Sequence, residues 1–215
     1  MRSSKNIVII ITLIISIIVS LAYVIYSTNQ ENFGGGATMP FTITNKQSTP
    51  MNDDGRGNAI FLDRHDMNCG NAPINQFRLQ RNSDLNQYQF NYKCSSAMQL
   101  DRPIGNATPW NDEGGGNAVF LDRHNVDCGA NNVLTRTHLR RKGDGNYQYE
   151  YSCARSNRPL KCRKATTGFN DEGDGNSVYL DRHNVECNGD EALSQFHLQR
   201  SGLGTYQFQF TCCKY

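Results

Sequence analysis

Three Asp-Arg-His triplets bring together side chains that can recognise a polar ligand. A carboxylate, a guanidinium and an imidazole offer both hydrogen-bond donors and acceptors. In an extended chain the first and third residues of a triplet share one face, and the second takes the other. The sequence thus predicts three exposed polar clusters at a rim, one for each triplet, that recognise a ligand. The competing interpretation is an Asp–Arg or Asp–His pair that only fixes the loop before the next cysteine. The candidate residues are Asp63, Arg64, His65, Asp122, Arg123, His124, Asp181, Arg182 and His183.

Two kinds of metal site are conceivable from the sequence, at the triplets and at the glycine-rich loops. A threefold axis could bring the three triplet histidines together as a metal site, and the His-x3-Cys spacing suggests zinc. Each copy, however, has one His and two Cys, which is one ligand short of a usual zinc site. Acidic glycine-rich loops offer oxygen ligands of the kind that calcium prefers, but not at the spacing of an EF-hand. We predict no metal and no cofactor. The weak calcium candidates are Asp53, Asp54, Asp112, Glu113, Asp171 and Glu172.

The eight cysteines follow the same spacing as the triplets. Eight cysteines allow 105 pairings, but one bridge within each copy is the simplest choice, and the two remaining cysteines can pair with each other. Each 25-residue loop closed in this way should stabilise the fold by roughly 3–4 kcal/mol. Such bridges indicate an oxidising compartment. The predicted pairs are Cys69–Cys94, Cys128–Cys153, Cys187–Cys212 and Cys162–Cys213.

Other features that could carry chemistry are weaker. His138 and His197 are predicted to be solvent-facing strand residues. Trp110 occurs once, and Met51 and Phe169 stand at the matching positions, which favours core packing over a sugar-stacking platform. Asn106-Ala107-Thr108 is a glycosylation sequon followed by proline. No serine nucleophile motif, phosphate-binding loop or His-Glu-x-x-His occurs. An enzyme needs one asymmetric catalytic site, whereas this sequence motif occurs in three near-copies. We therefore predict a non-enzymatic protein.

The sequence that forms the elements around these residues occurs in three similar copies. The triplets recur every 59 residues, which predicts a repeat architecture. Each copy begins with an Asn/Asp/Gly turn and continues with a short apolar strand such as Ala59–Leu62, predicted to be central. A mixed strand such as 195–200 follows, and then a strand that alternates aromatic and polar residues, such as Tyr147–Cys153. This period of two places one face in the core.

The predicted fold is therefore all-β. Three repeats of about 59 residues (38–94, 95–153 and 154–215) would share one core in a pseudo-threefold arrangement of the β-trefoil or β-prism type, because closure removes exposed strand edges. The alternative is three small disulfide-bonded modules in a row, each of which would be marginally stable alone.

The N-terminal part is predicted to cross a membrane. Residues 7–26 form an uncharged, mainly apolar run of 20 residues, long enough for one transmembrane helix. Arg2 and Lys5 precede the run, so residues 1–6 are predicted to be a cytosolic stub. Residues 27–37 read as a flexible tether, and the remaining chain is predicted to be extracytoplasmic. A cleaved signal peptide is the alternative to an uncleaved anchor.

This layout resembles that of membrane-anchored virion proteins of large algal DNA viruses. The resemblance lies in the Ile7–Ile18 run, the Asn29-Gln30-Glu31-Asn32-Phe33 tether and the Leu-Asp-Arg-His motifs. It implies a structural or surface protein of a particle with an internal membrane beneath a capsid, and it implies no catalytic residues.

Two functions are expected from these features. The first is a membrane-anchored, disulfide-stabilised minor capsid protein that links a membrane to a protein shell. The alternative is a lectin-like ectodomain with three weak glycan- or receptor-binding sites. The expected partners are a lipid bilayer, capsid or surface proteins, and glycans. The net charge of +2 without a basic stripe argues against nucleic acid.

Overall fold

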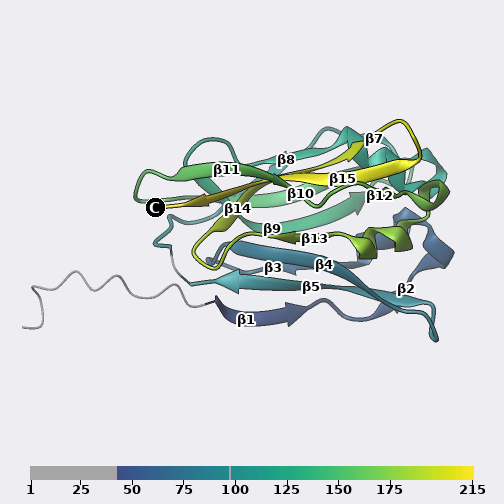
Figure 1. Ribbon diagram of the computed structural model, residues 1–215, viewed down its shortest axis with the longest axis horizontal. Helices are drawn as coiled ribbons and strands as arrows, with labels where there is room; N and C mark the ends of the chain where they lie inside the picture. The colour runs from purple at the N-terminus through teal and green to yellow at the C-terminus, as the bar shows by residue number, and fades with distance from the viewer. Residues whose placement is uncertain (1–42, 97) are drawn as a thin grey trace, which may run out of the picture. The chain divides into compact units, whose positions relative to one another are not determined.

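The computed structural model describes residues 43–96 and 98–215 (Figure 1). This part of the chain is predominantly β and contains three antiparallel sheets of five strands each. The all-β prediction is thus confirmed at this level. The predicted stub, anchor and tether lie outside the described residues, as do Phe41 and Thr42 of the first lead-in. Within the described ranges, no helix is long and apolar enough to span a bilayer.

Each sheet combines four strands that are close in sequence with one short strand from elsewhere in the chain. The first sheet contains β1 (Ile43–Ser48), β2 (Asn52–Asp53), β4 (Ile74–Asn82), β5 (Gln87–Ser95) and β13 (Asn184–Glu186). The second contains β3 (Asp66–Asn68), β6 (Ile104–Ala107), β7 (Asn111–Asp112), β9 (Asn132–Arg141) and β10 (Asn146–Arg155). The third contains β8 (Asn125–Asp127), β11 (Lys161–Thr166), β12 (Asn170–Asp171), β14 (Ala192–Arg200) and β15 (Thr205–Lys214).

The short strands link the three sheets in a ring. Strand β3 follows the first triplet but pairs with β9 of the second sheet. Strand β8 follows the second triplet and pairs with β14 of the third sheet. Strand β13 follows the third triplet and returns to pair with β4 of the first sheet. Each sheet is therefore completed by a strand from another copy of the sequence motif.

The prediction that the alternating aromatic strands form much of the core is confirmed. They form β5, β10 and β15, and their aromatic side chains join one hydrophobic cluster. Tyr88, Tyr147 and Tyr206 are fully buried. Phe77 and Phe196 meet edge to face with ring centroids 5.1 Å apart, a favourable aromatic geometry.

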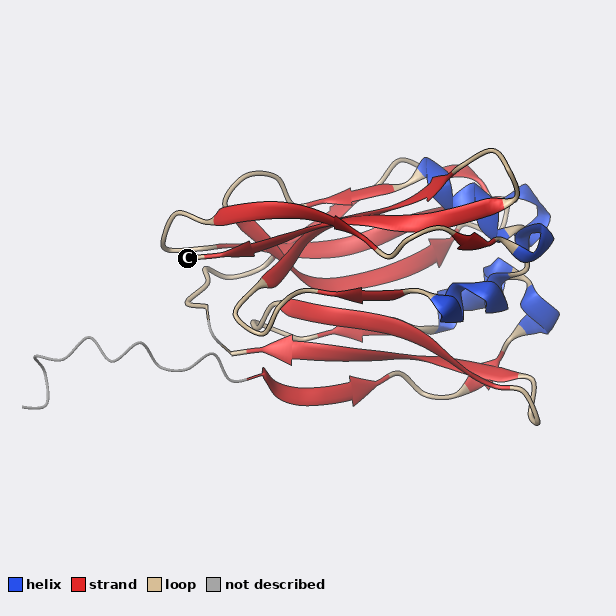
Figure 2. Ribbon diagram, viewed as in Figure 1, coloured by secondary structure: helices blue, strands red, loops and turns tan. Residues whose placement is uncertain are grey.

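The predicted central strand at Ala59–Leu62 is wrong, as are its two counterparts. These segments are 3-10 helices: η3 (Ala59–Arg64), η5 (Ala118–Arg123) and η7 (Ser177–Arg182). Each begins at an asparagine whose side chain accepts a backbone N–H; Asn58 Oδ1, for example, lies 3.0 Å from Ile60 N. This capping interaction starts a helical turn. The turns before them form the shorter 3-10 helices η2 (Gly55–Gly57), η4 (Gly114–Gly116) and η6 (Gly173–Gly175). Figure 2 shows that the helices gather at one end of the sheets.

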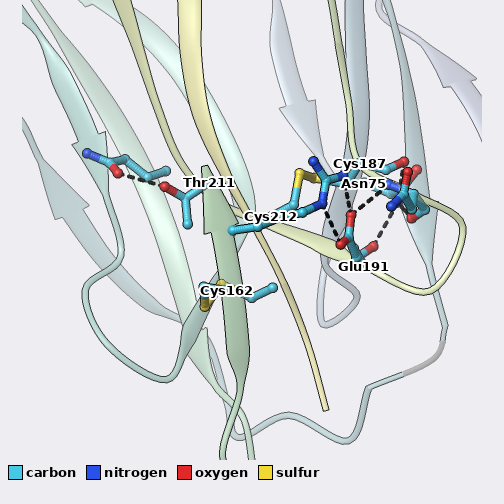
Figure 3. The surroundings of a disulfide bond; sticks show 10 residues. Asn75, Cys162, Cys187, Glu191, Thr211 and Cys212 are labelled. Carbon is cyan, nitrogen blue, oxygen red and sulfur yellow. Dashed lines mark hydrogen bonds and ion pairs between the residues drawn. A yellow bond between two sulfur atoms is a disulfide. The ribbon is translucent and has the colours of Figure 1, made fainter. Parts of the chain in front are cut away.

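All four predicted disulfide pairings are present in the structure. The bridge Cys187–Cys212 lies beside a polar network between the first and third sheets (Figure 3). There the fully buried Asn75 donates its side-chain N–H to the Glu191 carbonyl at 2.7 Å and to the Asn188 carbonyl at 3.0 Å. Three of the disulfides thus lie where neighbouring sheets meet, whereas Cys162–Cys213 joins the paired strands β11 and β15 within the third sheet.

A void of about 30 Å³ remains inside the core. Its lining includes Phe77, Phe196 and Thr137, which face matching positions of β5, β15 and β10. Threonine is the small residue of this trio, and its buried hydroxyl has no hydrogen-bond partner.

Replacement of Thr137 by valine is expected to stabilise the protein by about 1 kcal/mol, because it removes a buried unpaired hydroxyl without changing side-chain volume much. Urea unfolding at pH 7 measures the difference. Thr135→Val is the matched control: Thr135 is also buried but bonds the Ser152 carbonyl at 3.2 Å, so this variant should not be stabilised. A loss of stability in Thr137→Val would contradict the expectation.

Candidate functional site

The histidine of each triplet is buried rather than exposed at a rim. His65 is 2 % exposed, and its Nδ1 lies 2.8 Å from Thr49 Oγ1. Thr49 Oγ1 in turn accepts the Phe90 backbone N–H at 3.0 Å. The histidine thus connects the end of η3 to the lead-in segment and to β5. The other two pairs are His124–Thr108 at 2.8 Å and His183–Thr167 at 2.7 Å.

Burial also controls the protonation of these histidines. Burial, and to a smaller extent the neighbouring arginine of each triplet, together lower the pKa of His65, His124 and His183 to about 4. The Nε2 atom of each ring is buried without a hydrogen-bond partner. The three rings are therefore neutral near pH 7 and contribute to packing.

The other two triplet residues point to different surroundings. The Arg64 guanidinium lies 4.1 Å above the Phe61 ring centroid on the surface, and Arg123 and Arg182 repeat this stacking at 4.1 and 4.0 Å. The Asp63 backbone carbonyl bonds His138 Nε2 at 2.8 Å. The predicted exposed rim is wrong at its histidines, which are buried, and the extended geometry behind the predicted shared face does not apply, because Asp63 and Arg64 belong to the 3-10 helix η3. The Asp–Arg or Asp–His pair of the competing interpretation is not seen in the described residues either; Arg123 and Arg182 face Asp112 and Asp171, which lie outside the triplets.

His138 and His197 are half-buried and bonded, which corrects their prediction as simple solvent-facing residues. His197 Nε2 lies 2.7 Å from the Asp122 carbonyl. At the matching position Arg78 Nε donates to the Asp181 carbonyl at 3.1 Å. Each of these contacts joins a long strand to the end of a 3-10 helix from another sequence copy. These residues therefore connect neighbouring copies.

The metal sites considered from the sequence are not assembled. Among the described residues, the one grouping with metal-ligand geometry is Cys187, Glu191 and Cys212, and its two cysteines form a disulfide. The three triplet histidines are not part of any such grouping.

The acidic loops use their carboxylates internally. Asp53, Asp112 and Asp171 each accept the N–H of the glycine two residues on, at 2.8 Å. The next carboxylate in each loop is buried and faces an arginine, in the pairs Asp54–Arg81 at 3.5 Å, Glu113–Arg141 at 3.1 Å and Glu172–Arg200 at 3.2 Å. Each of these six carboxylates thus already has a partner within the protein.

Arg141→Ala should destabilise the protein by about 2 kcal/mol, because it leaves the buried Glu113 carboxylate without its bidentate partner. The neighbouring Arg140 provides the control. It pairs with Glu150 at 3.6 Å, and both side chains are well exposed, so Arg140→Ala should change stability by less than about 1 kcal/mol. Urea unfolding compares the two variants, and equal losses would refute the role of Glu113.

Trp110 is exposed, so its predicted core packing is wrong. It is 41 % exposed, and the matching Met51 and Phe169 are 36 % and 48 % exposed. These side chains lie just before β2, β7 and β12, on the outside of the sheets. The hairpin-tip residues Leu85 and Leu203 are also exposed. These five residues, here called the apolar end, lie toward the end of the sheets that carries the 3-10 helices.

The glycosylation candidate Asn106 is exposed on the edge strand β6. The threonine of its sequon, Thr108, is buried and bonded to His124. Modification would therefore have to precede folding of this segment.

The outer faces of two sheets form polar hollows that the sequence did not reveal. The first-sheet hollow has a volume of about 440 Å³, and its outward side chains are Lys46, Ser48, Gln76, Arg78, Asn91 and Lys93. The third-sheet hollow has about 320 Å³, and the corresponding side chains are Lys164, Thr166, Gln195, His197, Gln209 and Thr211. The alternation of polar and apolar residues predicted one solvent-exposed face for these strands. Only the pairing of the strands shows which polar residues become neighbours on that face.

No family model, curated protein or solved structure gives a significant match to this chain. The functional assignment therefore depends on the geometry of the described residues.

Proposed function

We propose that the protein is a membrane-anchored, disulfide-stabilised structural protein that links a membrane to a protein shell, such as the capsid of a virion. The N-terminus would be cytosolic and the β-domain extracytoplasmic. The partners would be the lipid bilayer and shell proteins.

The gathering of five of the six exposed large hydrophobic side chains of the described residues at one end of the domain supports this proposal. Strand β1 begins beside Ser95, at the end where β15 also finishes (Figure 1). A membrane anchor that precedes β1 would join the domain there. The apolar end lies at the other side, where Met51, Trp110 and Phe169 recur at matching positions. Exposed apolar groups of this kind are common at protein interfaces.

For the fold, we propose a pseudo-threefold, prism-like arrangement. Three separate sheets with the same strand order, each completed by a strand from another copy, favour a prism over a trefoil. Such a closed domain would act as a rigid spacer between its two ends.

A photocrosslinking amino acid at Trp110 in the full chain tests the structural function. Purified particles or membranes that carry the protein should give crosslinks to a second protein after irradiation. The control places the same group at Ile104, which is 71 % exposed and lies near the other end of β10. Equal crosslinking from both positions, or from neither, would contradict the proposal.

A lectin-like ectodomain is the second candidate function. The observation that favours it is the pair of polar hollows, which repeat the same strand positions on the first and third sheets. Amide and basic side chains of this kind suit hydroxyl-rich ligands.

A further inference from the structure

We propose that the first-sheet and third-sheet hollows are two binding sites for an acidic saccharide, a sugar that carries a carboxylate or sulfate group. This inference rests on the lectin-like candidate function. It moves the site from the Asp-Arg-His triplets to the outer sheet faces, and it sets the number of sites at two.

The two hollows have the same plan of side chains. On the edge strand, Lys46 pairs with Lys93 and Lys164 pairs with Thr211. Across the central strands, an amide stands beside a basic residue in each hollow: Asn91 faces Arg78 and Gln209 faces His197. Both volumes fall in the range of about 300–1,000 Å³ typical of small-molecule sites.

The charge of the hollows selects an anion. Neither lining contains a carboxylate. Within the described part of the chain, Lys46 and Lys164 have no hydrogen-bond or ion-pair partner, so both ammonium groups are free to bind a ligand. Lys93 pairs with Glu186 at 2.9 Å, which leaves the edge-strand lysine as the common cation of the two sites.

The amides select a ligand with hydroxyl groups. In each hollow one lining amide bonds a glutamine of the neighbouring strand that lies just outside the lining. Asn91 donates to Gln80 Oε1 at 2.6 Å and Gln209 donates to Gln199 Oε1 at 2.5 Å. Their orientation is thereby fixed, and each side chain keeps further donor or acceptor capacity. Hydroxyl groups both donate and accept, whereas a sulfate ion accepts only.

The second sheet is a natural comparison, because it has the same register with different chemistry. Gly105 occupies the position of the edge-strand lysine. Glu150 occupies the position of the amide and faces His138. An anion would therefore be disfavoured on this sheet.

The test is binding of the full chain, in detergent micelles, to immobilised glycans. The probes are a sialylated, a uronic-acid and a sulfated oligosaccharide, each beside its neutral parent. We expect binding to at least one acidic probe, at least 10-fold stronger than to its parent. Equal binding to acid and parent, or binding to no probe, overturns the inference. The probe that binds identifies the acidic group: a sialic acid, a uronic acid or a sulfate.

Charge-matched variants separate a site from a general surface effect. Lys46→Glu with Lys164→Glu should weaken binding at least 10-fold. The control, Lys142→Glu with Lys161→Glu, changes two exposed lysines outside the hollows and should keep binding within 2-fold. Equal loss in both pairs would overturn the inference. So would inorganic sulfate, if it competed at the same concentration as the acidic glycan.

A gain-of-site variant adds an independent readout. Gly105→Lys with Glu150→Gln should raise the number of glycans bound per chain from two toward three. An unchanged number would contradict the importance of the edge-strand lysine. None of these outcomes affects the crosslinking test at Trp110, so the structural function is judged separately.

Discussion

Acidification from pH 7 to pH 4 is expected to lower the free energy of unfolding by several kcal/mol, mainly because of three buried histidines. The folded-state pKa of His65, His124 and His183 is about 4, compared with 6.5 for a free histidine. A difference of this size corresponds to roughly 3 kcal/mol for each histidine.

The sign follows from proton binding. Above pH 6.5 the rings are neutral in both the folded and unfolded states, and the full stability is present. Between pH 6.5 and 4 the unfolded chain binds protons that the folded chain excludes, so stability falls as the pH falls. Glu186 and Glu191 have a lowered pKa because of Lys93 and Arg163. Their contribution is lost in the same direction, but at more acidic pH.

Urea unfolding at pH 7.5, 6, 5 and 4 measures this effect. His124→Asn is the informative variant, because asparagine can keep a polar atom near Thr108 and does not titrate. It should lose stability at pH 7.5 but show a pH dependence about one-third smaller than the unmodified protein. The half-buried His138 serves as the control position, and His138→Asn should keep most of the pH dependence. A flat stability profile from pH 7.5 to 4 would refute the role of the buried rings.

Gly116→Ala is expected to destabilise the protein by at least about 3 kcal/mol. Gly116 has φ +90°, and a Cβ there would lie 1.8 Å from Asn58 Oδ1. Asn58 is the N-cap of η3 and accepts the Ile60 N–H, so it cannot move away without loss of the cap. Backbone strain, steric overlap and cap loss all act in the same direction.

The adjacent Gly115 is the matched control for this substitution. It also has positive φ, +65°, but no atom lies within 4 Å of its added Cβ. Gly115→Ala should therefore show only the conformational penalty of about 1–2 kcal/mol. Urea unfolding of both variants at pH 7 makes the comparison, and similar losses would show that the contact between the two loops is unimportant. Gly57 and Gly175 make the same contact with Asn176 and Asn117.

The alternating strands and the disulfides could be predicted from the sequence because their signals are local or repeated. Tyr147–Cys153 alternates without interruption, and the spacing of Cys128 and Cys153 recurs in every copy. The apolar run Ala59–Leu62 is too short for its pattern to separate a strand from a helix. Asn58 ahead of it is a capping signal that would have favoured the helix.

The candidate site was harder to predict, because its residues meet only through tertiary pairing. His65 appears polar and exposed in sequence, but its partner Thr49 lies 16 residues upstream. Lys46 and Gln76 become neighbours only because β1 and β4 flank β5. Trp110 illustrates the opposite error, since an aromatic residue at a repeated position was expected inside and is exposed.

The exchange of short strands has a consequence for synthesis on the ribosome. The first sheet begins to form early but stays incomplete until the third copy is synthesised, because β4 must wait for β13, whose Asn184 bonds Gln76 108 residues earlier in the chain. Until then one edge of β4 lacks its final partner, and open edges invite pairing with other chains. A nascent chain that stalls before β13 would therefore expose an unpaired strand edge, which makes prompt translation through Asn184–Glu186 important for avoiding aggregation.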